Sequence, residues 1–267
     1  MQLADFAALH MPALETDEAR HNLILALLGR ALADPSGDLQ TWTLGPPGAC
    51  AIRMAGRPII LGEVDRQQAR ALAQVVRDLD YDGVVGPDRT APWFIERAQE
   101  LGHAFADPMP QRIHALSRPP AYSGAPGHAR SLSPEDAELF HAWRVAFSRE
   151  AVPHDPPSTR EGSQRILGEG RHLFWIDGGA PVAMAGIVRR TRTAGAIAAV
   201  YTPPALRGRG YAGSVTAAIV ERVFAEGRKT ACLYTDLRNP ASNRCYAKVG
   251  FTPVCDAWHC VRQRAPA

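Results

Sequence analysis

Apolar residues in the first half of the chain recur at helical spacing in some stretches and as short continuous runs in others. Apolar side chains at 23–24 and 27–28 fall on one helical face, and Thr16 precedes them as a candidate N-cap. The elements expected here are, in order, a helix to Ala31, strands 40–44, 49–54 and 58–64, a helix from Asp65 to Leu79, strand 82–86, a helix from Thr90 to Gly102, and two short strands.

The second half repeats this order. Ser133 and Asp136 are spaced as a capping box with Pro134 at the first helical position, so a helix is expected to begin there. The elements expected next are a short helical segment at 159–167, strands 172–177, 181–189 and 196–202, a helix 211–225, strand 230–235, a helix 240–249, and final strands at 251–254 and 258–262.

Two halves with one element order predict a duplicated α+β fold, with mixed, mostly antiparallel sheets flanked by helices. The segment 118–128 separates them. It holds three prolines and two glycines, which neither a helix nor a sheet ladder accommodates. We therefore expect an N-terminal domain at 1–118, a linker at 119–129 and a C-terminal domain at 130–267.

Charge and composition indicate which classes of partner the protein is expected to lack. The 267 residues carry a formal net charge of only +3, and the arginines are spread along the chain among acidic residues. A nucleic-acid-binding protein is expected to show a basic stripe, so no nucleic-acid partner is predicted. No apolar run approaches the roughly 18 residues of a membrane span, and the N-terminus lacks the pattern of a signal peptide. We expect a cytoplasmic protein without a membrane partner, and the sequence leaves its oligomeric state open.

Five cysteines are present, and none forms a Cys-x-x-Cys pair. Cys255, His259 and Cys260 lie close together near the C-terminus, but a zinc site needs a second pair of ligands that the sequence lacks. We expect reduced, partly buried thiols and no metal.

The segment from Val200 to Gly213 carries the candidate chemistry. It is expected to run from the end of a strand, through a glycine-containing loop, into the start of a helix, where backbone N–H groups and the helix dipole form an anion site. Glycines at 208 and 210 allow a phosphate to approach the main chain. Arg207 and Arg209 can donate charge-assisted hydrogen bonds to phosphate oxygens. The sequence therefore predicts a diphosphate site.

Two kinds of cofactor fit such a loop. Gly208, Gly210 and Gly213 match the dinucleotide fingerprint G-x-G-x-x-G, and Asp236 ends the next strand as an acid for a ribose would. In the dinucleotide fold, however, the first glycine follows its strand almost directly, whereas residues 203–207 intervene here. The dinucleotide alternative is less favoured and stays open.

Taken as Arg207-x-x-Gly210-x-Ala212, the same loop resembles the pyrophosphate loop of the GNAT acyltransferase superfamily. The stretch 234–251 is similar to the family's next strand, its Asn-x6-Tyr signature and its closing Gly-Phe. The chain also resembles a group of bacterial predicted acetyltransferases built from two GNAT-like halves, and the clear resemblance covers roughly residues 131–262.

The resemblance implies coenzyme A as the cofactor, most simply acetyl-CoA, and an amine on a small molecule or peptide as the acceptor, acylated by direct transfer. It implies that Tyr246 protonates the departing thiolate. The residues that it places at the cofactor are Val200, Tyr201 and Thr202 on the last strand, Arg207, Gly208, Arg209, Gly210, Tyr211 and Ala212 in the loop and first helical turn, and Asn239 and Ser242 at the next helix.

Some of these residues also have purely structural explanations. Asn239 precedes Pro240 and makes a good N-cap, and Tyr246 could be a packed aromatic residue. No general base is evident, because strand 196–202 lacks a glutamate. Glu150 and Asp236 are the candidates for this role, with His141 and His172 less favoured.

The N-terminal half lacks the loop. Its corresponding segment, 62–69, has acidic residues where phosphates would bind. We therefore expect a degenerate GNAT-like domain at 1–118 that binds no cofactor and helps to shape the acceptor cleft, and a catalytic GNAT domain at 130–267. An alternative to the enzyme is a non-catalytic sensor that binds acyl-CoA.

Overall fold

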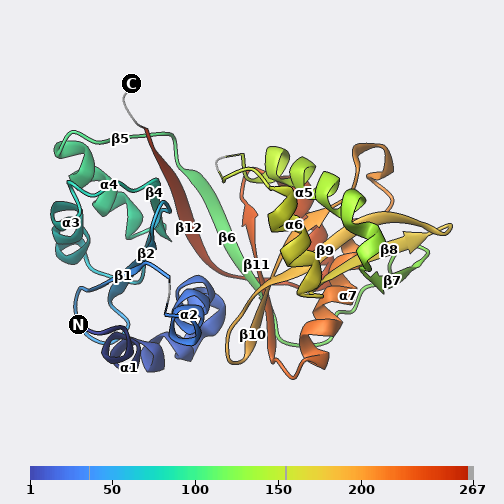
Figure 1. The fold of residues 1–267 in the computed structure, drawn as a ribbon, viewed down its shortest axis with the longest axis horizontal. Coiled ribbons are helices and arrows are strands. Elements are labelled where there is room, and N and C mark those ends of the chain that lie inside the picture. The colour runs from blue at the N-terminus through green and yellow to red at the C-terminus, as the bar shows by residue number, and fades with distance from the viewer. Residues whose placement is uncertain (36, 154, 264–267) are drawn as a thin grey trace. The chain divides into compact units, whose positions relative to one another are not determined.

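The structure is a computed structural model that describes residues 1–35, 37–153 and 155–263. Contacts divide the chain into two compact units, whose elements are labelled in Figure 1. Unit 1 comprises Met1–Ile113, Thr235–Arg238 and the chain from Pro253 onward, and unit 2 comprises His114–Tyr234 and Asn239–Thr252.

Unit 1 is a sheet flanked by helices. In chain order its elements are α1 (Leu3–Leu14), the 3-10 turn η1 (Glu15–Asp17), α2 (Glu18–Ala33), β1 (Leu39–Thr43), β2 (Cys50–Met54), β3 (Ile59–Leu61), α3 (Arg66–Val75), β4 (Gly83–Pro87), α4 (Ala91–Glu100), β5 (Ala104–Phe105), part of β6 (Met109–Leu116) and most of β12 (Thr252–Gln263). The strand order is β1-β2-β3-β4-β12-β6. Strands β3 and β4 are parallel, whereas β1–β2, β2–β3 and β4–β12 are antiparallel.

Unit 2 repeats this plan. Its elements are β7 (His128–Ser131), the 3-10 turn η2 (Pro134–Asp136), α5 (Ala137–Ala151), α6 (Arg160–Gly168), β8 (His172–Asp177), β9 (Ala180–Arg190), β10 (Ala194–Tyr201), the 3-10 turn η3 (Pro204–Leu206), α7 (Tyr211–Ala225), β11 (Thr230–Asp236) and α8 (Pro240–Val249). The strand order from the end of β6 is β6-β11-β10-β9-β8-β7. Strands β10 and β11 are parallel, and the pairs β7–β8, β8–β9 and β9–β10 are antiparallel. The predicted α+β class with mostly antiparallel, helix-flanked sheets is confirmed.

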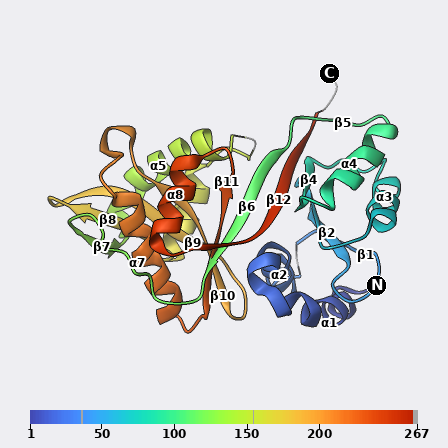
Figure 2. The same ribbon diagram turned by 180° about the vertical axis from the view of Figure 1, so that it is seen from behind.

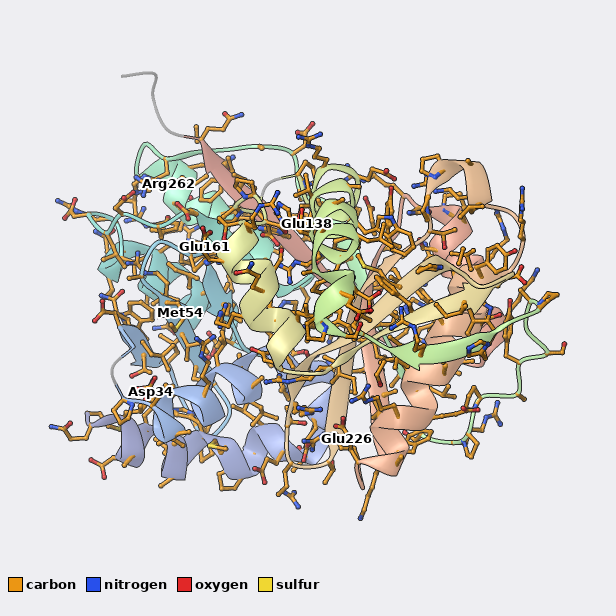
Figure 3. All side chains as sticks on the ribbon, turned by 45° about the vertical axis from the view of Figure 1, so that its right-hand side comes forward. Asp34, Met54, Glu138, Glu161, Glu226 and Arg262 are labelled. Atoms are coloured by element: carbon orange, nitrogen blue, oxygen red, sulfur yellow. The ribbon has the colours of Figure 1, made fainter. Side chains whose placement is uncertain are left out.

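The helices of unit 2 cover both faces of its sheet. Alternate residues of one strand point to opposite faces, and on β9 Ala183 and Ala185 pack in the cluster with α7 and α8, whereas Met184 packs in the cluster with α5. Figures 1 and 2 show the two helix layers from opposite sides. The outward side of the α5–α6 layer is charged, with Glu138 and Glu161 exposed (Figure 3).

Two local expectations are wrong. Thr16 does not cap the first long helix, because a preceding helix, α1, occupies the N-terminus and Thr16 Oγ1 donates a hydrogen bond to Ala13 O at 2.7 Å. The N-cap of α2 is Asp17, which accepts from the N–H of Arg20. The two strands expected at 251–254 and 258–262 are one strand, β12, and its pairing with β4 already begins at Ala257, inside the expected break.

The compact units differ from the predicted division at 119–129. That segment belongs to unit 2, where the N–H of Ala125 donates to Ser214 Oγ at 2.8 Å. The chain from Pro253 belongs to unit 1, because β12 completes the sheet beside β4. Residues 264–267 of the predicted C-terminal domain lie outside the described residues.

Within the described ranges, no helix combines the length and apolar character needed to cross a membrane. In the same part of the chain, no group of metal-ligating side chains gathers at one place.

His172, at the start of β8, is a titratable side chain buried inside unit 2. It is 4% exposed, and its ring lies edge-on to Phe140 with the centroids 4.9 Å apart. Neither ring nitrogen has a hydrogen-bond partner among the described residues. Burial, helped by the charges of Arg144, Arg171 and Arg222, lowers the pKa of His172 to about 3.

We expect His172 to make the protein sensitive to acid. The pKa of this side chain is 6.5 in the unfolded chain and about 3 in the folded protein. At a pH between these two values, the unfolded chain binds a proton at His172 that the folded chain does not. Its contribution therefore lowers the free energy of unfolding by about 1.4 kcal/mol between neutral pH and pH 5.5. Urea unfolding at pH 7.5 and 5.5 measures how much free energy of unfolding is lost on acidification. This loss should be smaller in His172→Leu than in the native protein. Equal losses would contradict a buried, neutral His172.

Candidate functional site

Strand β10 continues beyond its ladder with β11. The parallel pairing covers residues 194–197 of β10 and 230–233 of β11, whereas β10 continues to Tyr201. On its other side, β10 pairs with β9 across a bulge that includes Ala199, whose φ is 54°. Since a bulge bends its strand, the last residues of β10 turn away from the ladder and present their backbone groups at an edge.

The connection from β10 to α7 is the loop predicted to bind a diphosphate. After η3, Gly208 and Gly210 adopt φ values of 80° and 85°, in the left-handed region that favours glycine. A Cβ on Gly208 would meet nothing within 4 Å, so the loop is open at this point. The chain therefore turns into α7 with no side chain over the glycine backbone.

Helix α7 begins without a side-chain cap, because its N-cap residue is Gly210. The first N–H groups of a helix have no partner within it, and this end carries a partial positive charge. Among the described helices, α2, α3, α6 and α8 have a side-chain cap, from Asp17, Asp65, Thr159 and Asn239 respectively, whereas α1, α4 and α5 have none. An anion is the group that would complete the N-terminus of α7.

Arg207 is already engaged within unit 2. Its Nε donates to Thr202 O at 2.9 Å, and its Nη2 donates to Glu150 Oε2 at 2.5 Å. The guanidinium also lies over the ring of Tyr201, 5.8 Å from its centroid. Arg207 therefore ties the start of the loop to the end of β10 and to the last turn of α5.

Tyr211 contributes to the loop through its backbone. Its side chain is 6% exposed, and its hydroxyl donates to Asp177 Oδ2 at the end of β8. This hydrogen bond, with burial, raises the pKa of Tyr211, and Arg209 opposes the shift. Since its hydroxyl is engaged, Tyr211 can face an anion at the helix N-terminus only through its backbone N–H.

The predicted linker braces the loop, a role that the sequence did not reveal. Tyr122 Oη donates to Gly210 O at 3.3 Å, and the N–H of Ala125 donates to Ser214 Oγ at 2.8 Å. A Cβ on Gly213 would lie 2.3 Å from Tyr122 Oη, so only glycine leaves room for this ring. A glycine inside the pattern of a helix was the available signal of a close approach.

Helix α8 holds the remaining predicted residues. Asn239 Oδ1 accepts from the N–H of Ser242 at 3.1 Å, as an N-cap does. Tyr246 is 9% exposed in the core cluster of unit 2, with its ring 6.1 Å from that of Phe251. Burial raises the pKa of Tyr246, and the nearby Cys245 adds to the shift. The roles of Asn239, Ser242 and Tyr246 toward a cofactor stay predictions.

The candidate bases all have protein partners or are buried. Glu150 is paired with Arg207, and Asp236, in unit 1, forms an ion pair with Arg238 at 3.2 Å. His141 Nδ1 lies 3.0 Å from Ser163 Oγ. His172 is enclosed in the core and has its pKa lowered to about 3. None of the four is therefore both exposed and unpaired, as a general base would be.

The residues of unit 2 fit a coenzyme A diphosphate and pantetheine arm. The uncapped N-terminus of α7 and the open backbone at Gly208 suit the diphosphate. At the end of β10, Thr202 Oγ1 is buried without a hydrogen-bond partner among the described residues, so a polar group beside this strand would satisfy it.

The described residues of unit 1 hold no equivalent of this loop. At the start of α3, Asp65 accepts a hydrogen bond from the N–H of Gln68, and the Gln68 side chain accepts from the N–H of Asp65. The capping box fills the place where a phosphate would bind, and its carboxylate would repel one. That unit 1 binds no coenzyme A stays a prediction.

Comparisons with known proteins identify the fold. Residues 176–262 match the family model described as FR47-like protein. A Drosophila protein of known structure superposes with a TM-score of 0.71 at 14% identity, over 98% of this chain and 96% of that one. A GCN5-related N-acetyltransferase from Kribbella flavida gives 0.59 at 17% identity, over 91% and 96% of the two chains.

A tandem GNAT protein from the clavulanic acid biosynthesis pathway gives a TM-score of 0.55 at 15% identity, covering 91% of this chain and 88% of that one. No curated protein sequence matches the chain. At these identities the structures establish the fold. The predicted resemblance is supported at the level of the fold: the chain folds like the GNAT proteins of known structure, and residues 176–262 match the FR47-like model.

Proposed function

We propose that the protein is an acyltransferase that moves an acetyl group from acetyl-CoA to an amine on a small molecule or peptide by direct transfer. The observation that carries this proposal is the entrance to α7, where two left-handed glycines replace a side-chain cap and leave the helix N-terminus open to a diphosphate. The GNAT fold and the FR47-like match across this loop support it.

The end of β10 and the loop supply complementary contacts in this proposal. Backbone groups of Val200, Tyr201 and Thr202 pair with the pantetheine amides, as an added strand would pair with a free edge. The N–H groups from Gly208 to Ala212 bind the diphosphate, and the exposed Arg209 adds a charge. Arg207 acts indirectly, because its guanidinium holds the loop to Thr202 and Glu150.

Acetyl-CoA supplies the activated acyl group as a thioester. Tyr246 is the proposed acid: its hydroxyl donates a proton to the departing sulfur. The raised pKa keeps this hydroxyl protonated throughout the neutral range, so the proton is available when the carbon–sulfur bond breaks. A positioned donor is needed because a tyrosine, with an ordinary pKa near 10, is a weaker acid than a thiol of about 8.5.

We expect acetyl-CoA to bind at one site per chain and NAD not to bind. Six residues, 202–207, separate the end of β10 from Gly208, and β10 is parallel to β11 but antiparallel to β9, so the loop lacks the tight turn and the fully parallel sheet of a dinucleotide site. Isothermal titration calorimetry with both cofactors tests this. Binding of NAD with no response to acetyl-CoA would overturn the proposed cofactor.

A sensor that binds acyl-CoA without turnover is the second candidate. The pairing of Glu150 with Arg207 and of Asp236 with Arg238 favours it, since neither carboxylate is an uncommitted base. Thiol release from acetyl-CoA, followed with a panel of amines, separates the two functions. An enzyme shows release that depends on one or more amines, whereas a sensor shows saturable binding and no amine-dependent release.

A further inference from the structure

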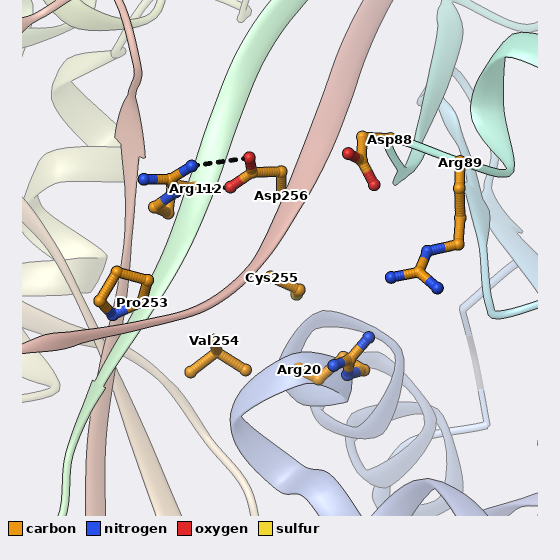
Figure 4. Close-up of a pocket in the computed structure, with 8 residues that line it drawn as sticks. All are labelled: Arg20, Asp88, Arg89, Arg112, Pro253, Val254, Cys255 and Asp256. Atoms are coloured by element: carbon orange, nitrogen blue, oxygen red, sulfur yellow. Dashed lines mark hydrogen bonds and ion pairs between the residues drawn. The ribbon is translucent and has the colours of Figure 1, made fainter.

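A pocket in unit 1 is lined by side chains that the proposed function does not use (Figure 4). Its volume is about 380 Å³, at the lower end of the range for small-molecule sites. The walls come from the first turn of α2, the connection between β4 and α4, β6, and the start of β12. All of these residues belong to unit 1.

The pocket lies at the carboxyl end of β4, the strand that pairs in parallel with β3. Asp88 and Arg89 follow β4 directly, and the Asp88 N–H donates to Asp256 O at 3.2 Å, which fixes this connection against β12. Ligands in sheets with parallel strands bind preferentially beyond the carboxyl ends of those strands. The position in the sheet is therefore one at which ligands are expected.

Two of the three arginines in the wall are already neutralised. Arg112 donates two hydrogen bonds to Asp256, from Nε at 2.6 Å and from Nη2 at 2.8 Å. Arg20 forms ion pairs with Asp17 at 3.1 Å and Glu63 at 2.7 Å. These pairs give the pocket a fixed, polar frame but leave little charge for a ligand.

Unlike Arg112 and Arg20, Asp88 and Arg89 are not neutralised by other side chains. Both are exposed, and neither side chain has an ion pair or hydrogen bond within the described ranges of the chain. In Figure 4 the carboxylate of Asp88 and the guanidinium of Arg89 point from the β4–α4 connection into the space bounded by Cys255 and Arg20. The pocket thus offers one free negative charge and one free positive charge.

The remaining wall is suited to reversible binding. Pro253 and Val254 supply apolar surface. Burial raises the pKa of Cys255 to about 11, so its thiol is protonated at neutral pH and is a poor nucleophile. The chemistry of the pocket is therefore charge recognition next to a small apolar wall.

We propose that this pocket binds a small zwitterion of the α-amino acid type, with the ligand carboxylate on Arg89 and the ligand ammonium on Asp88. A simple anion would leave the carboxylate of Asp88 unmatched and close to like charge, and a simple cation would do the same to Arg89. Only a ligand that carries both charges a few bonds apart satisfies both side chains.

Calorimetric titration of the full chain with the common α-amino acids, without acetyl-CoA, tests the proposal. At least one amino acid should bind saturably. For the tightest binder, the corresponding decarboxylated amine and the N-acetylated acid should each bind at least tenfold more weakly, because each lacks one charge. Inorganic phosphate should not displace it. Absence of binding by every amino acid, or displacement by phosphate, would refute the zwitterion site.

Variants locate the binding. Arg89→Gln and Asp88→Asn should each weaken the dissociation constant at least tenfold with an unchanged melting temperature, because neither side chain has an intramolecular partner. Arg57→Gln changes an exposed arginine of the turn between β2 and β3 and should leave binding as it was. Unaltered affinity in the two pocket variants would overturn the assignment. All of these variants should bind acetyl-CoA normally, so the proposed function is tested separately.

Discussion

Replacing Gly210 by aspartate is expected to weaken the binding of acetyl-CoA by at least about 2 kcal/mol, or roughly thirtyfold. Gly210 is the N-cap of α7, and its backbone heads the turn that has no side-chain cap. An aspartate there places a carboxylate at the helix N-terminus, where it takes the N–H groups that the diphosphate needs and repels its charge.

The same substitution should not unfold the protein. A Cβ at Gly210 would lie 3.5 Å from Ala125 Cβ and 3.5 Å from Tyr122 Oη, which are ordinary contacts. The φ of 85° costs some strain, but aspartate adds a favourable cap. Gly210→Asn has nearly the same shape and no charge, so it should lose less affinity than Gly210→Asp. Calorimetry with all three proteins gives the comparison, and native affinity in Gly210→Asp would mean that the phosphates bind elsewhere.

Tyr246→Phe is expected to lower turnover by roughly 100-fold while the dissociation constant of acetyl-CoA stays near its native value. The proton of the hydroxyl is needed only when the carbon–sulfur bond breaks, so its loss affects the rate and not the binding of the cofactor. The ring keeps its place against Phe251, which should preserve the fold. Turnover is measured with the amine that gives the fastest thiol release.

Tyr81→Phe is the matched control for this experiment. Tyr81 is also buried, packs edge-on against Phe94 and has its pKa raised to about 12 by burial, but it lies in unit 1. We expect its variant to turn over at nearly the native rate. A native rate in Tyr246→Phe as well would end the assignment of Tyr246 as the acid and make it a core aromatic residue.

Local signals predicted the start of several elements correctly. The helix start expected at Asp65 and the capping box expected at Ser133 both form, and both are capping boxes whose partners lie within four consecutive residues. Helix α1 was missed. It contains Pro12, a residue that usually marks a helix boundary, and it precedes the first clear apolar face.

The backbone of the candidate site was predictable, and the destinations of its side chains were not. Glycine at 208 and 210 permits an open, left-handed backbone, and both residues adopt it. Arg207 was expected to face a phosphate, but it donates to Glu150, a partner 57 positions away. Tyr122 reaches Gly210 across 88 positions. Such contacts depend on how distant segments pack, which no local spacing encodes.

The division into units also depends on how distant segments pack, so the sequence pattern did not predict it. Proline and glycine at 118–127 correctly indicate irregular backbone, which ends where β7 begins at His128, but composition does not say on which surface that backbone packs. Strand β12 has an ordinary strand pattern, and nothing in it reveals that its partner is β4 rather than a neighbour in sequence.

That pairing has a consequence for synthesis on the ribosome. Every residue of unit 2 precedes Pro253, so β4 has emerged long before the strand that pairs with it exists. Until then the nascent first unit carries an open hydrogen-bonding edge, the feature that promotes pairing with other chains. Folding of this unit cannot finish vectorially from the N-terminus. It must wait until β12 has been made, so residues 1–113 cannot complete their sheet before every residue of unit 2 has been synthesised.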